Sequence, residues 1–383
     1  MPTPAHESRD LLRDSLRRFL AAEASIATCA RPLFDDPRGT TPTLWRGLAE
    51  LGVLGVLLPT DMGGAGLDAA HAGVACEEMG RALFPGPFLA SAVAASALLG
   101  TLARNDETQR LGFALARGEQ VATLASDAPA TGYPTPEASV RARRAEKGPI
   151  TLTGRRSLVA FAETADVLLV PAADESAGGA ARPNVFAVER RAAGLGVEPA
   201  ECLDPARRPA TVIFANTPAL PLASDMTAAG ILAATSRAVD LAAAAAVADG
   251  VGAAQRAFEL ALDWARVRHQ FGRPIGSFQA VQHLLVDMLT EISLLRAATD
   301  EALTACDRGD AAARAHATAV AAAAAAHSLP EIGATVIQIF GGIGYTWEHD
   351  AHLFYRRLLG TSVSAGTEGQ NLDRVEALLF DQA

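Results

Sequence analysis

Apolar residues in the first part of the chain recur every three or four positions. From residue 7 to about 118 this spacing predicts helices, and one apolar stripe consists of Leu11, Leu12, Leu16, Phe19 and Leu20. Residues 58–66 interrupt the pattern, because they hold too much Gly and Pro for a helix, and we expect a new helix to begin near Asp68. The pattern predicts an N-terminal helical domain over residues 1–118.

The pattern changes after residue 118. Short apolar runs alternate with clusters of Gly, Pro, Asp and Arg, which is typical of strands; the runs are Val121–Leu124, Ile150–Leu152, Val167–Val170, Val185–Val188 and Thr211–Phe214. After residue 223 the chain is rich in alanine, with an unbroken alanine run at 321–326, and this composition favours thin, closely packed helices. We therefore expect a β-domain over 119–222 and a helical bundle domain over 223–383.

Composition narrows the class of protein. The 383 residues are 50% hydrophobic and 20% charged, which favours folded domains over disorder, and a length of this order suggests more than one core. The net charge of −10 argues against nucleic acid as the main partner. Unbroken apolar runs such as Leu241–Ala248 are far shorter than the ~20 residues that span a bilayer, so we expect a soluble protein with no membrane partner.

The N-terminus and the cysteines bear on location. Residues 1–10 lack the basic and then apolar order of a signal peptide. The four cysteines are far apart and match no metal-ligand or CxxC spacing; they are Cys29, Cys76, Cys202 and Cys306. We expect buried free thiols, no metal site and a cytoplasmic location.

Residues 268–279, Arg-His-Gln-Phe-Gly-Arg-Pro-Ile-Gly-Ser-Phe-Gln, form the first chemically informative segment. Arg268 offers a bidentate cation, Gln270 an amide and Phe271 an apolar plate, a combination that suits a pyrophosphate and its nucleoside. The alternative interpretation is a helix C-terminus at which Arg268 faces the helix dipole and Gly272 is the cap.

A second segment covers residues 336–350, Val-Ile-Gln-Ile-Phe-Gly-Gly-Ile-Gly-Tyr-Thr-Trp-Glu-His-Asp. Gln338 is followed by Gly341 and Gly342, and paired glycines let a backbone come unusually close to another group. Alternatively, the glycines only allow two helices to pack. For residues 347–350 we expect the start of a capped helix, with Asp350 or Thr346 as the cap, rather than a catalytic pair.

Together the two segments closely resemble the acyl-CoA dehydrogenase family. The resemblance implies that family's fold: a helical N-terminal domain, a central β-domain and a C-terminal four-helix bundle. It implies FAD as the cofactor, an acyl-CoA thioester as the substrate and an electron-transferring flavoprotein as the electron acceptor. It also implies cofactor contacts, usually to the FAD of a neighbouring subunit; the implied contact residues are Arg268, Gln270, Phe271, Gln279, Gln338, Gly341, Gly342 and Thr367.

The family's catalytic base is missing at both of its known positions. Dehydrogenation needs a carboxylate to take the α-proton, and most members place it directly before a Gly-Thr pair, where this chain has Ala365. Some members place the base on an earlier helix, at the position of Ala242. The nearest acids are Asp240 and Glu368, which leaves them as weak candidates for a relocated base.

The β-domain departs from the family as well. The resemblance places a flavin-ring loop at residues 125–132 and a Trp-Ile-Thr strand at Leu158-Val159-Ala160, neither with the family's residues. The family's threonine stabilises charge that develops during hydride transfer, and Leu158 and Ala160 offer no donor. Another residue could have taken over this role.

The retained residues are those that a subunit lends to a partner's FAD, and the missing ones serve its own flavin and substrate. Our leading hypothesis is therefore the base-lacking subunit of a heteromeric acyl-CoA dehydrogenase, in a dimer or heterotetramer with a base-bearing homologue. One alternative is a homomeric flavoenzyme with Asp240 or Glu368 as base. Others are a desulfinase-like or monooxygenase-like enzyme and a structural or acyl-binding partner without flavin.

Overall fold

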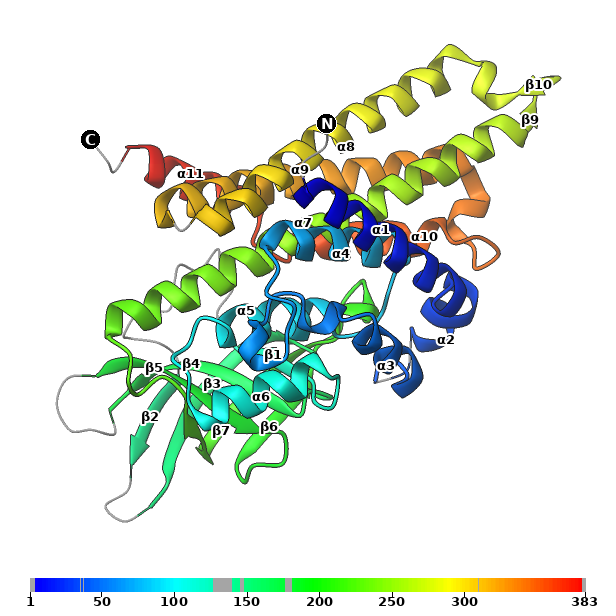
Figure 1. The fold of residues 1–383 in the computed structure, drawn as a ribbon. Helices are drawn as coiled ribbons and strands as arrows, with labels where there is room; N and C mark the ends of the chain where they lie inside the picture. The colour runs from blue at the N-terminus through cyan, green and yellow to red at the C-terminus, as the bar shows by residue number, and fades with distance from the viewer. Residues whose placement is uncertain are drawn as a thin grey trace. The chain divides into compact units, whose positions relative to one another are not determined.

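The computed structural model describes residues 4–34, 36, 38–126, 140–144, 148–175, 181–308 and 310–380. The elements follow the predicted order: helices up to Ala116, strands from Ala122 to Pro221, and helices again from Ala228 (Figure 1). Two compact units combine segments that are distant in sequence: Met1–Arg31, Gly73–Phe84 and Ala243–Ala383 form one unit, and Pro32–Ala72 and Pro85–Ala242 form the other. The bounds of the three predicted domains remain a prediction.

The second unit is built around a mostly antiparallel sheet. Its described residues give the strand order β6-β7-β3-β2-β4-β5-β8, and β1 pairs in parallel with β4. The strands are β1 (Ala122–Leu124), β2 (Val140–Arg144), β3 (Ile150–Ala160), β4 (Val167–Asp174), β5 (Arg182–Glu189), β6 (Leu195–Pro199), β7 (Pro209–Pro218) and β8 (Leu220–Pro221). Inward-facing apolar side chains, including Leu152, Phe186 and Phe214, form its core.

Short helices complete this unit. They are α3 (Pro42–Glu50), η2 (Val53–Gly55), η3 (Thr60–Met62), η4 (Leu89–Ala95), α5 (Ser96–Leu99), α6 (Asp106–Ala116) and η6 (Pro205–Arg207). A capping box fixes the start of α6, because the Asn105 side chain accepts from the Thr108 amide and the Thr108 side chain accepts from the Asn105 amide. The predicted break near residue 60 is confirmed, and α4 (Ala69–Arg81) begins one residue after Asp68.

The first unit is helical apart from one small hairpin. It contains α1 (Pro4–Glu23), η1 (Ile26–Ala30), most of α4, the greater part of α7 (Ala228–Val267), η7 (Ile275–Ser277), α8 (Gln279–Arg308), α9 (Ala311–Phe340), η8 (Gly341–Tyr345), α10 (Ala351–Ser362) and α11 (Glu368–Phe380). The short α2 (Arg31–Leu33) lies at the boundary. Helices α8 and α9 pack side by side, and α9 also contacts α10 and α11 (Figure 1).

Two glycines set how closely α4 and α7 cross. A Cβ on Gly80 of α4 would lie 1.9 Å from the Asp249 carbonyl oxygen of α7. Reciprocally, a Cβ on Gly252 of α7 would lie 1.9 Å from the Glu77 carbonyl oxygen of α4. Both distances are far below van der Waals contact, so the backbones of the two helices touch directly.

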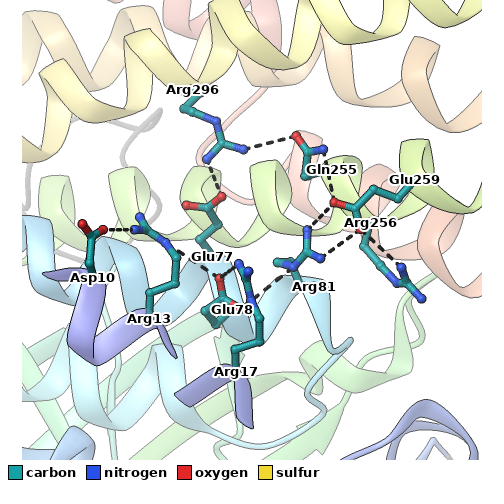
Figure 2. Close-up of polar contacts among 10 residues, drawn as sticks. All are labelled: Asp10, Arg13, Arg17, Glu77, Glu78, Arg81, Gln255, Arg256, Glu259 and Arg296. Carbon is teal, nitrogen blue, oxygen red and sulfur yellow. Dashed lines mark hydrogen bonds and ion pairs between the residues drawn. The ribbon is translucent and has the colours of Figure 1, made fainter. Parts of the chain in front are cut away.

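A network of ion pairs links α1, α4, α7 and α8 near this crossing (Figure 2). Arg17 donates two hydrogen bonds to the buried Glu78 carboxylate, Nε to Oε2 at 2.8 Å and Nη2 to Oε1 at 2.6 Å. Arg81 binds Glu259 in the same bidentate way at 2.9 Å for each bond, and Arg296 contacts Glu77. Glu77 and Glu78 of α4 and Glu259 of α7 each bind an arginine from another helix, which ties the four helices together.

Among the described residues, two helices are long and apolar enough to cross a membrane by length and composition, namely Ala228–Val267 and the stretch Ala311–Tyr345. Of the apolar windows concerned, 72% and 56% of the residues are buried inside the structure. Core helices of soluble proteins pass the same test, so this is weak evidence for a membrane span.

The four cysteines are free thiols. Cys29, Cys76 and Cys306 are buried as expected, but the expectation is wrong for Cys202, which is exposed. Cys202 lies in an irregular segment between β6 and η6, a position that its spacing from the other cysteines did not reveal.

Candidate cofactor and substrate site

The first motif folds into a hairpin at the end of α7. The helix stops at Val267, and β9 (His269–Gln270) pairs with β10 (Arg273–Pro274). The two turn residues, Phe271 and Gly272, have φ values of 51° and 80°, the positive values that a two-residue type I′ turn requires. The alternative interpretation of Gly272 as a helix cap is therefore wrong.

The hairpin presents its motif side chains outward. Phe271 is 91% exposed although its positive φ is strained for a non-glycine residue. Arg268 and Gln270 are exposed beside it, and Gln279 is exposed at the first position of α8. The guanidinium of Arg273 lies 4.1 Å from the Phe278 ring centroid, so the base of the hairpin is packed while its tip is open.

The second motif forms the end of α9. Gln338 is exposed in the last turn of the helix, and Gly341 ends it with a φ of 67°. A Cβ added to Gly341 or Gly342 would meet no atom within 4 Å. Neither glycine is needed for helices to pack within the described chain, so that alternative interpretation is wrong. Both leave open space that a bound group or a partner can fill.

An aromatic stack joins the two motifs. The ring of Trp264, in the last turn of α7, stacks on Phe340 at the end of α9 with 5.3 Å between centroids. The Arg268 guanidinium lies 5.7 Å from the Trp264 ring centroid, and the His349 ring lies 4.2 Å from Phe340. Two segments that are far apart in the sequence therefore form one exposed group of site residues.

The segment 347–350 has a structural role here. Asp350 occupies the N-cap position of α10, but its side chain makes no capping hydrogen bond; its carboxylate instead accepts a 2.8 Å hydrogen bond from Arg31 Nε. His349 Nδ1 accepts from the Ala351 amide at 3.1 Å, so the expected capping side chain is replaced by His349. Burial lowers the pKa of His349 against the opposing effect of Asp350, which favours the neutral ring that this bond needs.

The position of the missing base is apolar. Ala365 is 5% exposed and packs in a cluster with Ala243 of α7 and Ala322 of α9. Ala243 directly follows Ala242, so the helix that carries the second base position contributes to the same cluster. Ala322 and Gln338 are roughly 24 Å apart along α9, which separates this cluster from the exposed motif group.

Thr367 and Glu368 begin α11 beside this cluster. The Thr367 hydroxyl accepts from the Gln370 amide at 3.3 Å, while Gln370 Oε1 accepts from the Thr367 amide at 3.0 Å, which forms a capping box. Glu368 is half exposed and lies 3.6 Å from His327 Nδ1. Asp240 is fully buried on α7, and Ala242 is half-buried.

In the β-domain, the side chains of Leu158 and Ala160 offer no hydrogen-bond donor, as the sequence indicated. Leu158 is exposed in a bulge of β3 at a φ of 58°, and the Ala160 carbonyl accepts from the Thr123 hydroxyl at 2.7 Å. Residues 127–132 of the expected flavin loop lie outside the described residues. Within the described residues no cluster of three or more His, Cys, Asp or Glu side chains could hold a metal ion.

Family models match both helical regions. Residues 6–119 match the acyl-CoA dehydrogenase N-terminal domain, and residues 228–379 match the acyl-CoA dehydrogenase C-terminal domain. The chain is 30% identical over 376 residues to acyl-CoA dehydrogenase IpdE2 of Mycobacterium tuberculosis, with 98% of each protein covered.

The chain belongs to the acyl-CoA dehydrogenase family. The predicted fold class is thereby confirmed. Acyl-CoA dehydrogenase FadE34 of the same organism is 32% identical over 375 residues, which are 97% of this chain but 47% of that protein. The solved structure of the Tcur3481-Tcur3483 steroid ACAD is 28% identical with a TM-score of 0.85, and 99% of each chain is covered.

Members of the acyl-CoA dehydrogenase family are flavoproteins, and part of this chain fits FAD. The exposed group fits its nucleotide half: Arg268 for phosphate oxygens, Phe271 for an apolar face and Gly341-Gly342 as a cradle without side chains. The alanine cluster around Ala365 offers no acid for the substrate. The site residues remain predictions, since no bound group tests them.

Proposed function

We propose that this chain is the base-lacking subunit of a heteromeric acyl-CoA dehydrogenase and that it completes the FAD site of a base-bearing homologue. The observation that carries the proposal is the contrast between two groups of residues in one helical unit. The group formed by the hairpin tip and the end of α9 is exposed and open. The base position Ala365 is closed among alanines.

The exposed group supports a contact in trans. Within the described chain nothing occupies the space beside Gly341 and Gly342, and Phe271 projects from the hairpin with almost no cover. Phe271 combines a positive φ, which is strained for a non-glycine residue, with an aromatic ring left in solvent, and this combination supports a binding role.

The relatives support a paired assembly. The solved steroid ACAD is named for two proteins, Tcur3481 and Tcur3483. More than half of FadE34 lies outside its match to this chain, which leaves length for a second chain of this size. We therefore propose a homologous subunit as the partner and a bulky acyl-CoA thioester, such as a steroid side chain, as the substrate.

When bound, FAD supplies the hydride acceptor for oxidation of the Cα–Cβ bond. This chain contributes binding: Arg268 donates to phosphate oxygens, while Gln270 and Gln338 donate amide hydrogens. Phe271 and Gln279 cover the nucleotide, and Gly341 and Gly342 admit it close to the backbone. The α-proton goes to a carboxylate of the partner, since Ala365 and Ala242 cannot accept it.

The first test compares the flavin spectrum of the chain alone with that of the chain co-expressed with a homologue that has Glu before Gly-Thr. We expect a colourless chain alone, and a yellow pair that an acyl-CoA thioester bleaches. A chain that is yellow alone and is reduced by a thioester would contradict the proposal.

Variants test the in-trans contact. Arg268→Ala and Gln338→Ala should each weaken FAD retention by the pair about tenfold, because each removes a hydrogen bond to a charged or polar cofactor group. Arg266→Ala is the matched control, since Arg266 lies on the same helix end but pairs with Asp263. Unchanged flavin content in both site variants would contradict the proposed contact of this chain with the FAD of its partner.

A homomeric enzyme with a relocated base is the second candidate. Glu368 supports it, because this half-exposed acid lies three residues after Ala365 and beside His327. Asp240 is less suitable, being fully buried on α7. Glu368→Gln should leave the activity of the pair unchanged under our proposal, whereas under this alternative it should abolish the activity of the chain alone. We further propose a cytoplasmic location and an electron-transferring flavoprotein as acceptor.

A further inference from the structure

One buried amide holds the turn that carries the missing base. Asn371, in the first turn of α11, is 0% exposed. Its Nδ2 donates to the Ala365 carbonyl at 3.1 Å and to the Thr367 carbonyl at 3.0 Å. A single side chain therefore ties both ends of the Ala365–Thr367 turn to the helix that follows it.

The amide works only as a donor. Asn371 Oδ1 is buried and accepts no hydrogen bond from the described part of the chain. Burying a polar atom without a partner is costly, so an apolar residue would suit this position better unless the two donor hydrogens matter. The orientation is unambiguous, because only the nitrogen end of an amide can face two carbonyl oxygens.

Other contacts fix the rest of the turn. Gly366 has a φ of 100°, a conformation that a side chain would strain, and its amide donates to the Val363 carbonyl at 3.2 Å. The Thr367–Gln370 capping box holds the solvent side, and the methyl group of Ala365 packs on Ala243 and Ala322. Asn371 is the polar anchor on the interior side.

We propose that Asn371 is a positioning residue that holds the Ala365–Thr367 turn in the shape in which Thr367 meets the cofactor. This inference rests on the proposed function, because it takes Thr367 as a cofactor contact. Asn371 itself acts through the turn and touches no reacting group.

The test uses Asn371→Asp in the full chain, co-expressed with its partner. The substitution keeps the shape of the side chain but replaces two donor hydrogens with a carboxylate that faces two carbonyl oxygens. In the flavin-free assembly, amide hydrogen exchange at Gly366 and Thr367 should accelerate about tenfold or more. With FAD added, flavin retention should fall and the visible flavin spectrum should shift.

Ser328→Ala is the matched control. Ser328 is buried in the same helical unit, and its hydroxyl donates to Glu291 Oε2 of α8 at 2.7 Å rather than to a residue of the turn. It should lower stability without changing exchange at residues 365–367 or the flavin spectrum. If Asn371→Asp does not fold, Asn371→Ser keeps one donor hydrogen and should shift exchange and flavin retention in the same direction by less.

Unchanged exchange at the turn in the Asn371 variants would overturn the inference. Faster exchange with unchanged flavin retention and spectrum would also overturn it, because the turn would then position nothing. In both cases, loss of flavin in Arg268→Ala and Gln338→Ala would still support the proposed function. Unchanged flavin content in those two variants would instead contradict the proposed function itself.

Discussion

Arg357 of α10 donates a hydrogen bond from Nη1 to each carboxylate oxygen of Asp249 on α7, at 3.1 Å for both bonds. Both side chains are more than nine-tenths buried, and Arg357 Nη2 also donates to the Phe84 carbonyl at 3.1 Å. The pair lies where the glycine crossing of α4 and α7 brings two helix backbones into contact. Because both side chains are buried there, water cannot solvate the charge that remains if one partner is removed.

Removal of one partner of this pair should destabilise the chain strongly. Arg357→Leu or Asp249→Leu should each lower the free energy of unfolding by about 3–5 kcal/mol, because the other charge stays buried and unpaired. The double variant should lose less than the sum of the two. Chemical denaturation measures all three. The exposed Arg308–Glu301 pair is the control, and Arg308→Ala should change stability by less than about 1 kcal/mol. Single variants as stable as Arg308→Ala would contradict this reading of the pair.

The helix crossing should not tolerate even one methyl group. Gly80→Ala and Gly252→Ala each place a Cβ against a carbonyl oxygen, so the helices must separate at a cost of about 3 kcal/mol. Gly369→Ala in α11 is the matched control, since its Cβ would meet nothing within 4 Å; helix propensity predicts a gain of up to about 1 kcal/mol. Thermal unfolding of the three variants checks the prediction, and equal melting temperatures would disprove it.

Substitution of Phe271 at the hairpin tip should raise the stability of the chain and weaken its binding of FAD. Phe271→Asn places Asn-Gly in the turn, the preferred pair for two residues with positive φ, and should stabilise the chain by about 1 kcal/mol. The same change should weaken FAD retention by the assembly, because it removes the exposed aromatic face. Thermal unfolding and flavin content are measured on the same preparation. A variant with lower stability would show that Phe271 packs in a way that its 91% exposure does not suggest.

Stability should fall in mildly acidic solution. The pKa values of His349 and His352 are both lowered mainly by burial, so the folded state binds fewer protons than the unfolded state just below pH 6.5. Their contribution is fully present above pH ~6.5 and is lost as the pH falls through the folded pKa values. Unfolding free energies at a series of pH values should show this slope, and His349→Asn should flatten it. An unchanged slope in that variant would remove His349 as a cause.

The cysteines should react in a fixed order. Cys202 is exposed, whereas burial keeps the other three thiols from reagents and raises the pKa of Cys29 to about 11. In the native chain iodoacetamide should therefore label Cys202 first, although burial raises the pKa of Cys202 too. Peptide mass analysis over a time course identifies the site. Cys202→Ser should abolish the fast phase, and fast labelling of a second cysteine would contradict the burial of that thiol.

Periodicity predicted the elements where a side-chain pattern was strong. The strand over Val167–Val170 and the helix that begins after Asp68 were both foreseen. Strand β2 was missed, because only Val140 and Ala142 face the core and its other residues are arginines. The hairpin over residues 269–274 was missed as well, since Phe-Gly is an unusual pair for a turn in which both residues have positive φ.

The site was predictable in its residues but not in its contacts. The motifs named Arg268, Gln338 and the glycine pair, yet no local pattern predicts that Trp264 stacks on Phe340 and joins the two segments. Asn371 was not found, because a buried amide in an amphipathic helix has no distinguishing sequence signal. Its role depends on two carbonyl oxygens that only the folded turn brings together.

The frame around Ala365 has a genetic consequence. Gly366, Thr367 and Asn371 hold the turn through backbone atoms and a buried amide, and none of these contacts involves the side chain at position 365. Each glutamate codon becomes an alanine codon by a single nucleotide change. One such change would remove the base and leave the contacts of Gly366, Thr367 and Asn371 in place. Duplicated genes can divide catalysis and cofactor binding between two chains in one mutational step.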